Sequence, residues 1–159
     1  MVKETTLPDL SFRRAVAADL PTLVAMLADD VLGQARERPA LPLAQEYQDG
    51  FAAIDADPRQ LLLVAERDGA IAGMLQLTCI PGISHLGSWR GQIEGVRVAS
   101  TARGQGVGQA MMRHALGIAR ERGCKIVQLT TNKSRADAKR FYEQLGFEPA
   151  HEGMKLTLA

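Results

Sequence analysis

The chain has 159 residues, 46% of them hydrophobic and 23% charged, with a formal net charge of +1 at pH 7. This length and composition are typical of one globular domain with a sizeable core. The near-neutral charge and the aromatic content of 4% exclude the broad basic surface and the stacking platforms of nucleic-acid-binding proteins.

The N-terminal region lacks the long apolar stretch of a signal peptide or a membrane span. Cys79 and Cys124 have neither metal-site spacing nor a disulfide framework, and the histidines form no cluster. We therefore expect a cytoplasmic protein with reduced thiols, no metal and no membrane partner. Residues 1–9 are polar and contain Pro8, which predicts a loose tail before a single domain over residues 10–159.

The first part of the chain predicts a strand and two helices. Residues 10–16 form the strand, and Asp19 can cap a helix that has Pro21 in its first turn. A polar connection over residues 33–42 leads to the second helix. Apolar residues gather on one face of each helix: Leu20, Leu23, Val24, Leu27 and Val31 on the first, Leu43, Tyr47, Phe51 and Ile54 on the second.

A hairpin and a loop come next in the chain. Strand-like runs cover residues 61–66 and 71–78, and Asp68-Gly69 between them is a strong signal for a tight turn. Residues 81–91 are then predicted to form a loop.

The strand over residues 93–98 has a break in its pattern. Val96 and Val98 are displaced by one position from the alternation that Ile93 begins. One extra residue at Gly95 would return them to the same side, as a β-bulge does.

A glycine-rich segment, Arg103-Gly104-Gln105-Gly106-Val107-Gly108, joins this strand to a helix over residues 107–122. Glycine lets a backbone approach a ligand closely, and a helix N-terminus offers unpaired N–H groups. Together they predict a cradle for pyrophosphate. The segment is not the dinucleotide fingerprint, because Gln109 replaces the last glycine, and it is not a P-loop, because no Lys-Ser/Thr follows Gly108.

The remaining chain predicts a strand, a helix and a hairpin. Residues 125–131 form the strand, and Ser134 with Asp137 matches a capping box. The helix ends at Gly146, and residues 147–158 should form a final hairpin that closes the sheet. The apolar face of the helix consists of Ala138, Phe141, Tyr142 and Leu145.

Two motifs in order point to a known family. The R-x-x-G-x-G pattern of Arg103, Gly106 and Gly108 resembles the acetyl-CoA pyrophosphate loop of the GNAT superfamily of N-acyltransferases. Residues 138–147 resemble the A-x-x-x-Y-x-x-x-G-F segment that follows it there. The resemblance extends over about residues 10–158. Within the superfamily, the C-terminal part looks like aminoalkylphosphonate N-acetyltransferases, and also like small-amine and protein-amine acetyltransferases.

The resemblance implies an α/β fold of α+β type. A single mixed, mostly antiparallel sheet would have a splayed and bulged middle strand and about four flanking helices. It also implies transfer of an acetyl group from acetyl-CoA to a primary amine, by direct attack in a ternary complex. A non-catalytic acyl-CoA-binding or regulatory module on the same fold is the alternative, because fold does not fix function.

The resemblance also implies two catalytic residues. Tyr142 matches the family tyrosine that gives a proton to the departing thiolate, and its alternative role is that of a half-buried aromatic side chain. Glu94 is the candidate base that receives a proton from the amine through water. Its alternative role is a structural carboxylate paired with Arg90 or Arg97.

Acetyl-CoA would be held mainly by main-chain groups. Val96 and Val98 would bind pantetheine, and residues 103–108 would bind the pyrophosphate. Where relatives carry Asn, this chain has Arg135, which could face the 3′-phosphate or solvent, while Asn132 could supply the amide instead.

The acceptor is a small-molecule or peptide amine, and no nucleic acid is expected as a partner. His85 and Trp89 are candidates for the border of the acceptor pocket. A homodimer remains open as the state of assembly.

Overall fold

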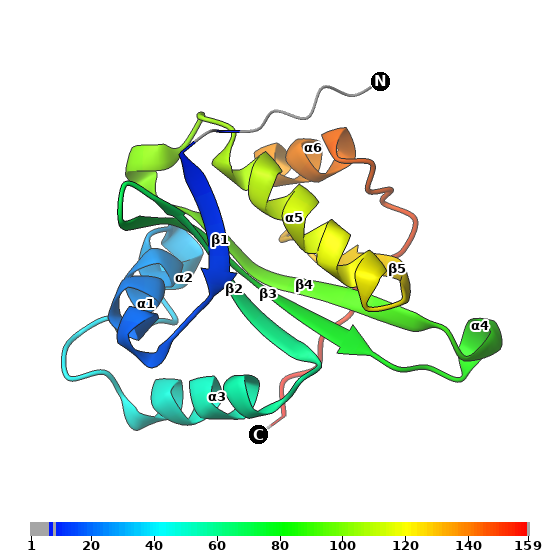
Figure 1. The fold of residues 1–159 in the computed structure, drawn as a ribbon, viewed down its shortest axis with the longest axis horizontal. Helices are drawn as coiled ribbons and strands as arrows, with labels where there is room; N and C mark the ends of the chain where they lie inside the picture. Colours follow the sequence, from blue (N-terminus) through cyan, green and yellow to red (C-terminus); the bar gives the residue numbers. More distant parts are fainter. Residues whose placement is uncertain (1–6, 8, 159) are drawn as a thin grey trace.

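In the computed structural model, which describes residues 7 and 9–158, a five-stranded sheet runs through the middle of the molecule (Figure 1). Neighbouring strands are antiparallel from β1 to β4, and β5 is parallel to β4. The predicted mixed, mostly antiparallel sheet is therefore confirmed. The strands, in their order in the sheet, are β1 (Leu10–Arg14), β2 (Gln60–Arg67), β3 (Ala70–Ile80), β4 (Trp89–Val98) and β5 (Cys124–Leu129).

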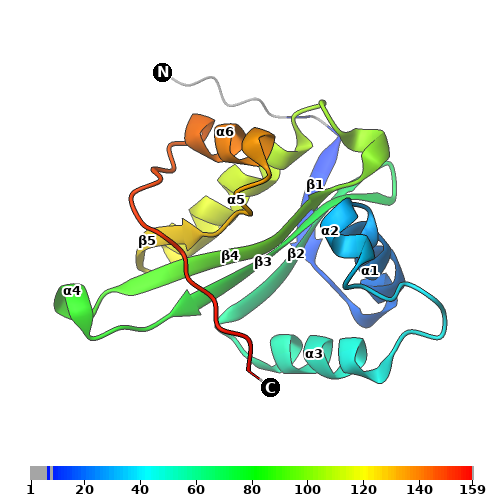
Figure 2. The same cartoon turned by 180° about the vertical axis from the view of Figure 1, so that it is seen from behind.

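Helices cover both faces of this sheet (Figures 1 and 2). One face carries α5 (Val107–Glu121), with α6 (Ala136–Gln144) beside its N-terminal half. The other face carries α1 (Leu20–Ala28), the short α2 (Val31–Gln34) and α3 (Gln45–Ala56). A single turn, α4 (Ser84–Gly87), lies at the tip of the β3–β4 connection. Among the described residues, no helix is long and apolar enough to cross a membrane.

The core has one cluster on each face of the sheet. Side chains of β2 alternate between them, with Leu63 directed to the α5 side and Leu62 and Val64 to the α1 side. Burial on both faces explains why β2 is a continuous apolar run. The buried stripe of α5 recurs at helical spacing: Val107, Met111, Ala115 and Ala119.

The predicted bulge lies in β4. Gln76 pairs with Glu94 and Met74 with Arg97, so β4 has one extra residue relative to β3. Gly95 has φ +62, a left-handed value that suits glycine at such a bulge. Val96 and Val98 consequently pack in the same cluster as Ile93, and Arg97 faces the α1 side.

The splay of the middle strand is also present. The parallel pairing between β4 and β5 ends at Ile93 and Leu129, although β4 continues to Val98. The last residues of β4 therefore have no neighbouring strand on that side within the described sheet. This edge of β4 is therefore unpaired, and a slot lies between it and the turn before α6, lined by Val96, Val98, Ser134 and Arg135.

Two predicted helix caps are wrong. The Asp19 carboxylate accepts hydrogen bonds from the Val16 N–H and from Arg13, and it makes no cap bond to α1. Ser134 donates to Asn132, while Asp137 pairs with Arg140. In both places the polar side chain binds another partner instead of an N–H group at the start of the helix.

The predicted C-terminal hairpin is also wrong, because residues 147–158 contain no strand. Met154, Leu156 and Leu158 alternate as a strand would, yet each is more than four-fifths exposed. The segment crosses the sheet face that lies opposite α5 instead of running beside β5 (Figure 2). Alternation alone does not make a strand, which also needs a neighbour to pair with.

The predicted hairpin turn between β2 and β3 is confirmed, since Asp68 and Gly69 have φ of 52 and 75. Of the predicted loose tail, residues 1–6 and 8 lie outside the described residues, and Leu7 packs against the core. The division into a tail and one domain stays a prediction.

Candidate active site

The glycine loop leads directly into α5. Gly104 and Gly106 have φ of +73 and +82, where L side chains are strained. Gly106 is the N-cap residue of α5 and has no side-chain cap, so the N–H groups of the first turn have no partner within the helix. A Cβ on Gly104 would meet no atom within 4 Å, so space is open beside the loop. These features fit the cradle that the sequence predicted.

The third glycine of the motif has a different function. A Cβ on Gly108 would lie 3.3 Å from both the Val98 and the Phe141 side chains. Gly108 therefore allows α5, β4 and α6 to pack closely. Glycine at this position is explained by helix packing, independently of any ligand.

The side chains of the loop are turned away from the cradle. Gln105 accepts a hydrogen bond from Arg67 at 2.7 Å and donates to the Thr101 carbonyl at 2.9 Å. Val107 is buried in the core. Arg103 pairs with Asp29 at 2.9 Å and donates to the Val98 carbonyl at 3.3 Å. What this loop offers a ligand is therefore mostly backbone.

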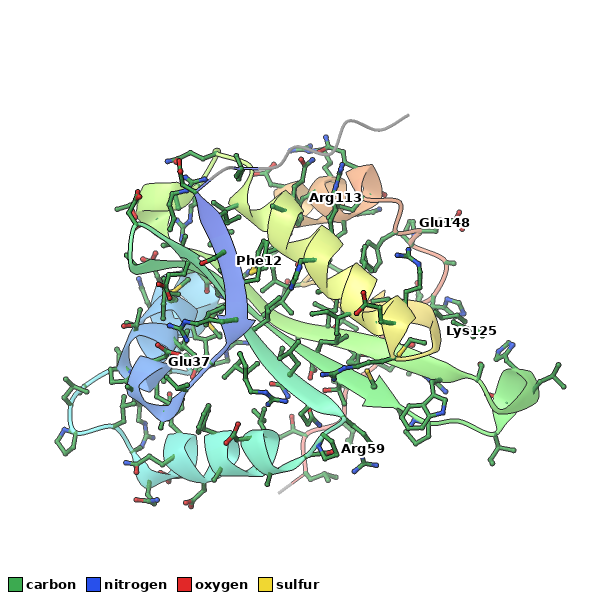
Figure 3. The ribbon with its side chains drawn as sticks, in the orientation of Figure 1. Phe12, Glu37, Arg59, Arg113, Lys125 and Glu148 are labelled. Atoms are coloured by element: carbon green, nitrogen blue, oxygen red, sulfur yellow. The ribbon has the colours of Figure 1, made fainter. Side chains whose placement is uncertain are left out.

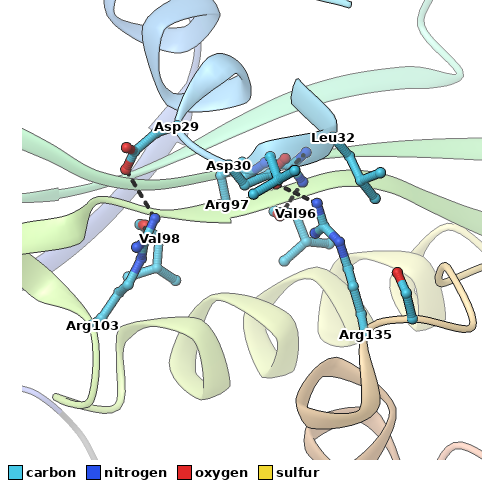
Figure 4. Close-up of a pocket in the computed structure, with 10 residues that line it drawn as sticks. Asp29, Asp30, Leu32, Val96, Arg97, Val98, Arg103 and Arg135 are labelled. Carbon is cyan, nitrogen blue, oxygen red and sulfur yellow. Dashed lines mark hydrogen bonds and ion pairs between the residues drawn. The ribbon is translucent and has the colours of Figure 1, made fainter. Parts of the chain in front are cut away.

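A cavity of about 490 Å³ opens at the splayed end of β4 (Figure 4). Four segments line it: the end of β4, the α1–α2 connection with the start of α2, the first residue of the glycine loop, and the turn before α6. Its lining residues are Asp29, Asp30, Val31, Leu32, Val96, Arg97, Val98, Arg103, Ser134 and Arg135.

Asp30 lies at the centre of the charges in this cavity. Its carboxylate accepts the Gly33 N–H at 2.6 Å, contacts Arg97 at 3.4 Å, and forms a close ion pair with Arg135 (Figure 4). Burial alone would raise the pKa of Asp30, but the Gly33 N–H and the two arginines outweigh burial and hold it below its usual value. Asp30 is therefore an ionised partner of the arginines and a poor base.

Arg97 is the more deeply buried of these two arginines, with 14% of its side chain exposed. Its Nη1 donates to the Val96 carbonyl at 2.9 Å, whereas its Nε has no partner in the described structure. Burial lowers the pKa of Arg97, and Asp30 opposes that effect only in part.

Tyr142 projects from α6 with a packed ring and a free hydroxyl. The ring meets Phe141 and Phe147 edge-on, at centroid distances of 5.2 and 6.0 Å. No hydrogen-bond partner of its hydroxyl is found within residues 7 and 9–158. Burial raises the pKa of Tyr142, and the positive charges of Arg97 and Arg135 act in the opposite direction.

Glu94 is exposed on β4, opposite Gln76 of β3. Its alternation with Ile93 directs it away from α5, toward the same face as Arg97. The structural alternative is not observed, because Arg97 pairs with Asp30 and no ion pair of Glu94 is found in the described part of the chain.

The other predicted residues are more scattered. Asn132 accepts hydrogen bonds from the N–H and the hydroxyl of Ser134, so it shapes the turn before α6. Trp89 begins β4, roughly 30 Å from Val98 at the usual rise of a strand, and His85 lies beyond it in α4. The structure therefore does not bring His85 and Trp89 to the cavity.

Sequence reasoning missed Asp29, Asp30 and the part that Arg97 plays with them. Two adjacent carboxylates after a helix usually signal a solvated turn, and the pattern of β4 gave no partner for Arg97. Within residues 7 and 9–158, no three His, Cys, Asp or Glu side chains lie close enough together to hold a metal ion.

Comparisons with known proteins agree with this geometry. The model of the acetyltransferase (GNAT) family matches residues 23–147. The aminoalkylphosphonate N-acetyltransferase of Salmonella typhimurium is 30% identical over 149 residues, which are 94% of this chain and 92% of that protein. Streptothricin acetyltransferase of Streptomyces lavendulae is 33% identical over 84% of this chain, which spans 61% of that protein.

A crystal structure is also similar over nearly the whole chain. It is described as a transcriptional regulator from Bacillus halodurans C-125 and has a TM-score of 0.91 and 50% sequence identity. The match covers 94% of this chain and 99% of that chain.

Proposed function

This chain belongs to the acetyltransferase (GNAT) family, and we propose that it transfers the acetyl group of acetyl-CoA to a primary amine. The observation that carries the proposal is the arrangement at the end of β4. A glycine cradle begins α5, a slot lies where β4 separates from β5, and Tyr142 is near enough to Arg97 of β4 for that charge to act on its hydroxyl.

The residues present fit acetyl-CoA, which when bound would supply an acetyl thioester. The N–H groups at the start of α5, with Gly104 and Gly106 in left-handed conformations, would hold the pyrophosphate. The main chain of Val96 and Val98, in the part of β4 that has no pairing with β5, would bind pantetheine. Arg103 and Asn132 remain candidates for further contacts to the donor, whereas Arg135 pairs with Asp30 inside the cavity.

Tyr142 would hold the proton for the departing sulfur at its hydroxyl oxygen. This hydroxyl is protonated at neutral pH, and burial raises the pKa of Tyr142 further above its ordinary value of 10.0. Arg97 and Arg135 oppose that shift and so make the loss of the proton easier. Ring packing against Phe141 and Phe147 would fix the direction of the hydroxyl.

Glu94 would receive a proton from the attacking amine, through water. It lies on the same face of β4 as Arg97, it is open to solvent, and no ion pair occupies it in the described structure. A primary amine titrates near ~10, so most of it is protonated at neutral pH and needs such a route.

We propose a small-molecule or peptide amine as the acceptor. The relatives named above act on an aminoalkylphosphonate and on streptothricin, which are chemically unlike. His85 and Trp89 lie at the far end of β4 from the cavity and are not part of this proposal. We place the protein in the cytoplasm, where Cys79 and Cys124 would stay free thiols. A homodimer is the state of assembly that we propose.

A second function is favoured by one observation. The Bacillus halodurans chain is described as a transcriptional regulator and is 50% identical, so a non-catalytic acyl-CoA-binding module is the alternative. Thiol release from acetyl-CoA, measured with aminoalkylphosphonates, aminoglycosides, polyamines, amino acids and peptides, separates the two. We expect release well above acetyl-CoA hydrolysis with at least one amine. Tight acetyl-CoA binding without turnover on any amine would favour the module.

A further inference from the structure

The charges in the cavity do not balance. Arg103 pairs with Asp29, one guanidinium to one carboxylate. Arg97 and Arg135 both pair with Asp30, so two guanidinium groups share one carboxylate (Figure 4). One positive charge is left without a counter-charge among the residues that line the cavity.

Part of the uncompensated charge is on a largely buried side chain. Arg97 is largely buried, and its Nε–H has no hydrogen-bond partner in the described chain. Buried donors and charges are normally satisfied, because leaving them unpaired is costly. An oxyanion with two or three oxygens would accept such donors and supply the missing negative charge.

We propose that Arg97 and Arg135 bind an oxyanion on the acceptor, so that this protein selects primary amines that also carry a phosphonate, phosphate or carboxylate group. This inference rests on the proposed acetyl transfer and adds the chemical class of its acceptor. Asp30 then orients the two guanidinium groups and competes with the ligand for them.

The position of Arg97 favours the acceptor over the phosphates of acetyl-CoA. Val96 and Val98 pack on the face of β4 that carries α5 and the glycine cradle. Arg97 lies between them in sequence and reaches Asp30 on the opposite face. It is also near enough to Tyr142 for its charge to act on the hydroxyl. An oxyanion held there would place an attached amine on the acceptor side of the slot.

The test compares acceptors that share an amine and differ in charge. We expect kcat/KM for 2-aminoethylphosphonate or β-alanine to exceed that for n-propylamine by at least about 10-fold. Arg97→Met should lower kcat/KM for the preferred anionic amine by about 10²-fold and that for n-propylamine at least about 10-fold less, since a neutral amine loses only the effect of the Arg97 charge on Tyr142. Arg97→Lys, which keeps the charge and loses the planar fork, should fall in between. Arg113→Met, on the exposed side of α5 (Figure 3), is the matched control.

Asp30→Asn should change the binding of the anionic amine in the direction opposite to Arg97→Met. A purely structural Asp30 would not produce this effect. The amide keeps an oxygen for the Gly33 N–H but no longer neutralises the arginines. KM for the anionic amine should therefore fall, whereas a merely structural Asp30 would leave KM unchanged or raise it. Melting temperatures of all variants identify any that fail to fold.

A binding measurement keeps the inference separate from acetyl transfer. Calorimetry with methylphosphonate should detect binding to the wild-type protein that Arg97→Met weakens about 10-fold or more, even if no amine is acetylated. Acetyl-CoA affinity should be unchanged in Arg97→Met. A preference for n-propylamine, an equal loss on charged and neutral amines, no methylphosphonate binding, or a matching loss of acetyl-CoA affinity would each overturn the inference.

Discussion

At the scale of single residues, Tyr142 combines a well-packed ring with a hydroxyl that has no partner in the described structure. Phe141 and Phe147 contact the ring, so its position is fixed by hydrophobic packing. The hydroxyl contributes little to that packing. A substitution that removes only the oxygen can therefore separate a catalytic function from a structural one.

Tyr142→Phe should lower the turnover rate by about 10² to 10⁴-fold, the usual contribution of one acid–base group. The melting temperature and the acetyl-CoA affinity should hardly change, because the ring contacts and the glycine cradle are retained. One preparation suffices for a melting curve, acetyl-CoA calorimetry and a thiol-release assay. Near-normal turnover in a stably folded variant would remove Tyr142 from the mechanism.

Residues that act through backbone were easier to predict than residues that act through charge. The glycine motif anticipated the loop geometry at Gly104 and Gly106, because positive φ is a local property. Arg97 and Asp30 form an ion pair although they are far apart in the chain, and no local sequence pattern predicts this contact. The sequence likewise gave no sign that Gly108 is required by Val98 and Phe141.

At the scale of elements, the bulge in β4 and the hairpin turn before β3 were predictable from the residues at those positions. Helix caps were not, because a polar side chain near a helix start has several competing partners. Asp19 shows the competition directly. It contacts Arg13 at 2.7 Å, and Arg13 also donates to Glu66 at 2.8 Å, so β1, β2 and the start of α1 are held together.

Asp19→Asn should lower the free energy of unfolding at pH 7 by about 1–2 kcal/mol. The expected loss is small because Arg13 is partly exposed and solvent weakens its ion pair with Asp19. The hydrogen bond from Arg13 holds the pKa of Asp19 below its ordinary value of 3.8, so the folded state binds fewer protons there than the unfolded state. This stabilisation is complete above pH 3.8 and is lost as the pH falls through the lower folded pKa. Urea unfolding of both proteins between pH 7 and pH 3 should show the difference shrinking.

Asp137→Asn is the matched control for this carboxylate. Asp137 lies in the first turn of α6 with 93% of its side chain exposed, and its ion pair with Arg140 is on the surface. Its substitution should change stability little at any pH in the series. An equal effect of the two substitutions would contradict the argument for Asp19.

At the scale of the whole molecule, the helical layers on the two faces of the sheet meet where β4 separates from β5. α5 and α6 hold one side of the β4 end, and the α1–α2 connection holds the other through Asp29 and Asp30. A ligand that binds there touches elements from both layers. Binding should therefore stabilise the folded state as a unit, by an amount that depends on ligand concentration and affinity.

Acetyl-CoA at about 100 times its Kd should stabilise the protein by about 2.7 kcal/mol and raise the melting temperature by about 5–10 °C. Gly106→Asp should abolish most of this shift, because it strains a residue at φ +82 and places a negative charge at the N-terminus of α5. Gly50→Asp is the matched control, since a Cβ on Gly50 in α3 meets no atom within 4 Å. Thermal melts with and without acetyl-CoA compare the three proteins. A full shift in Gly106→Asp would place the donor phosphates elsewhere, and loss of the shift in both variants would mean that the effect is not specific to the cradle.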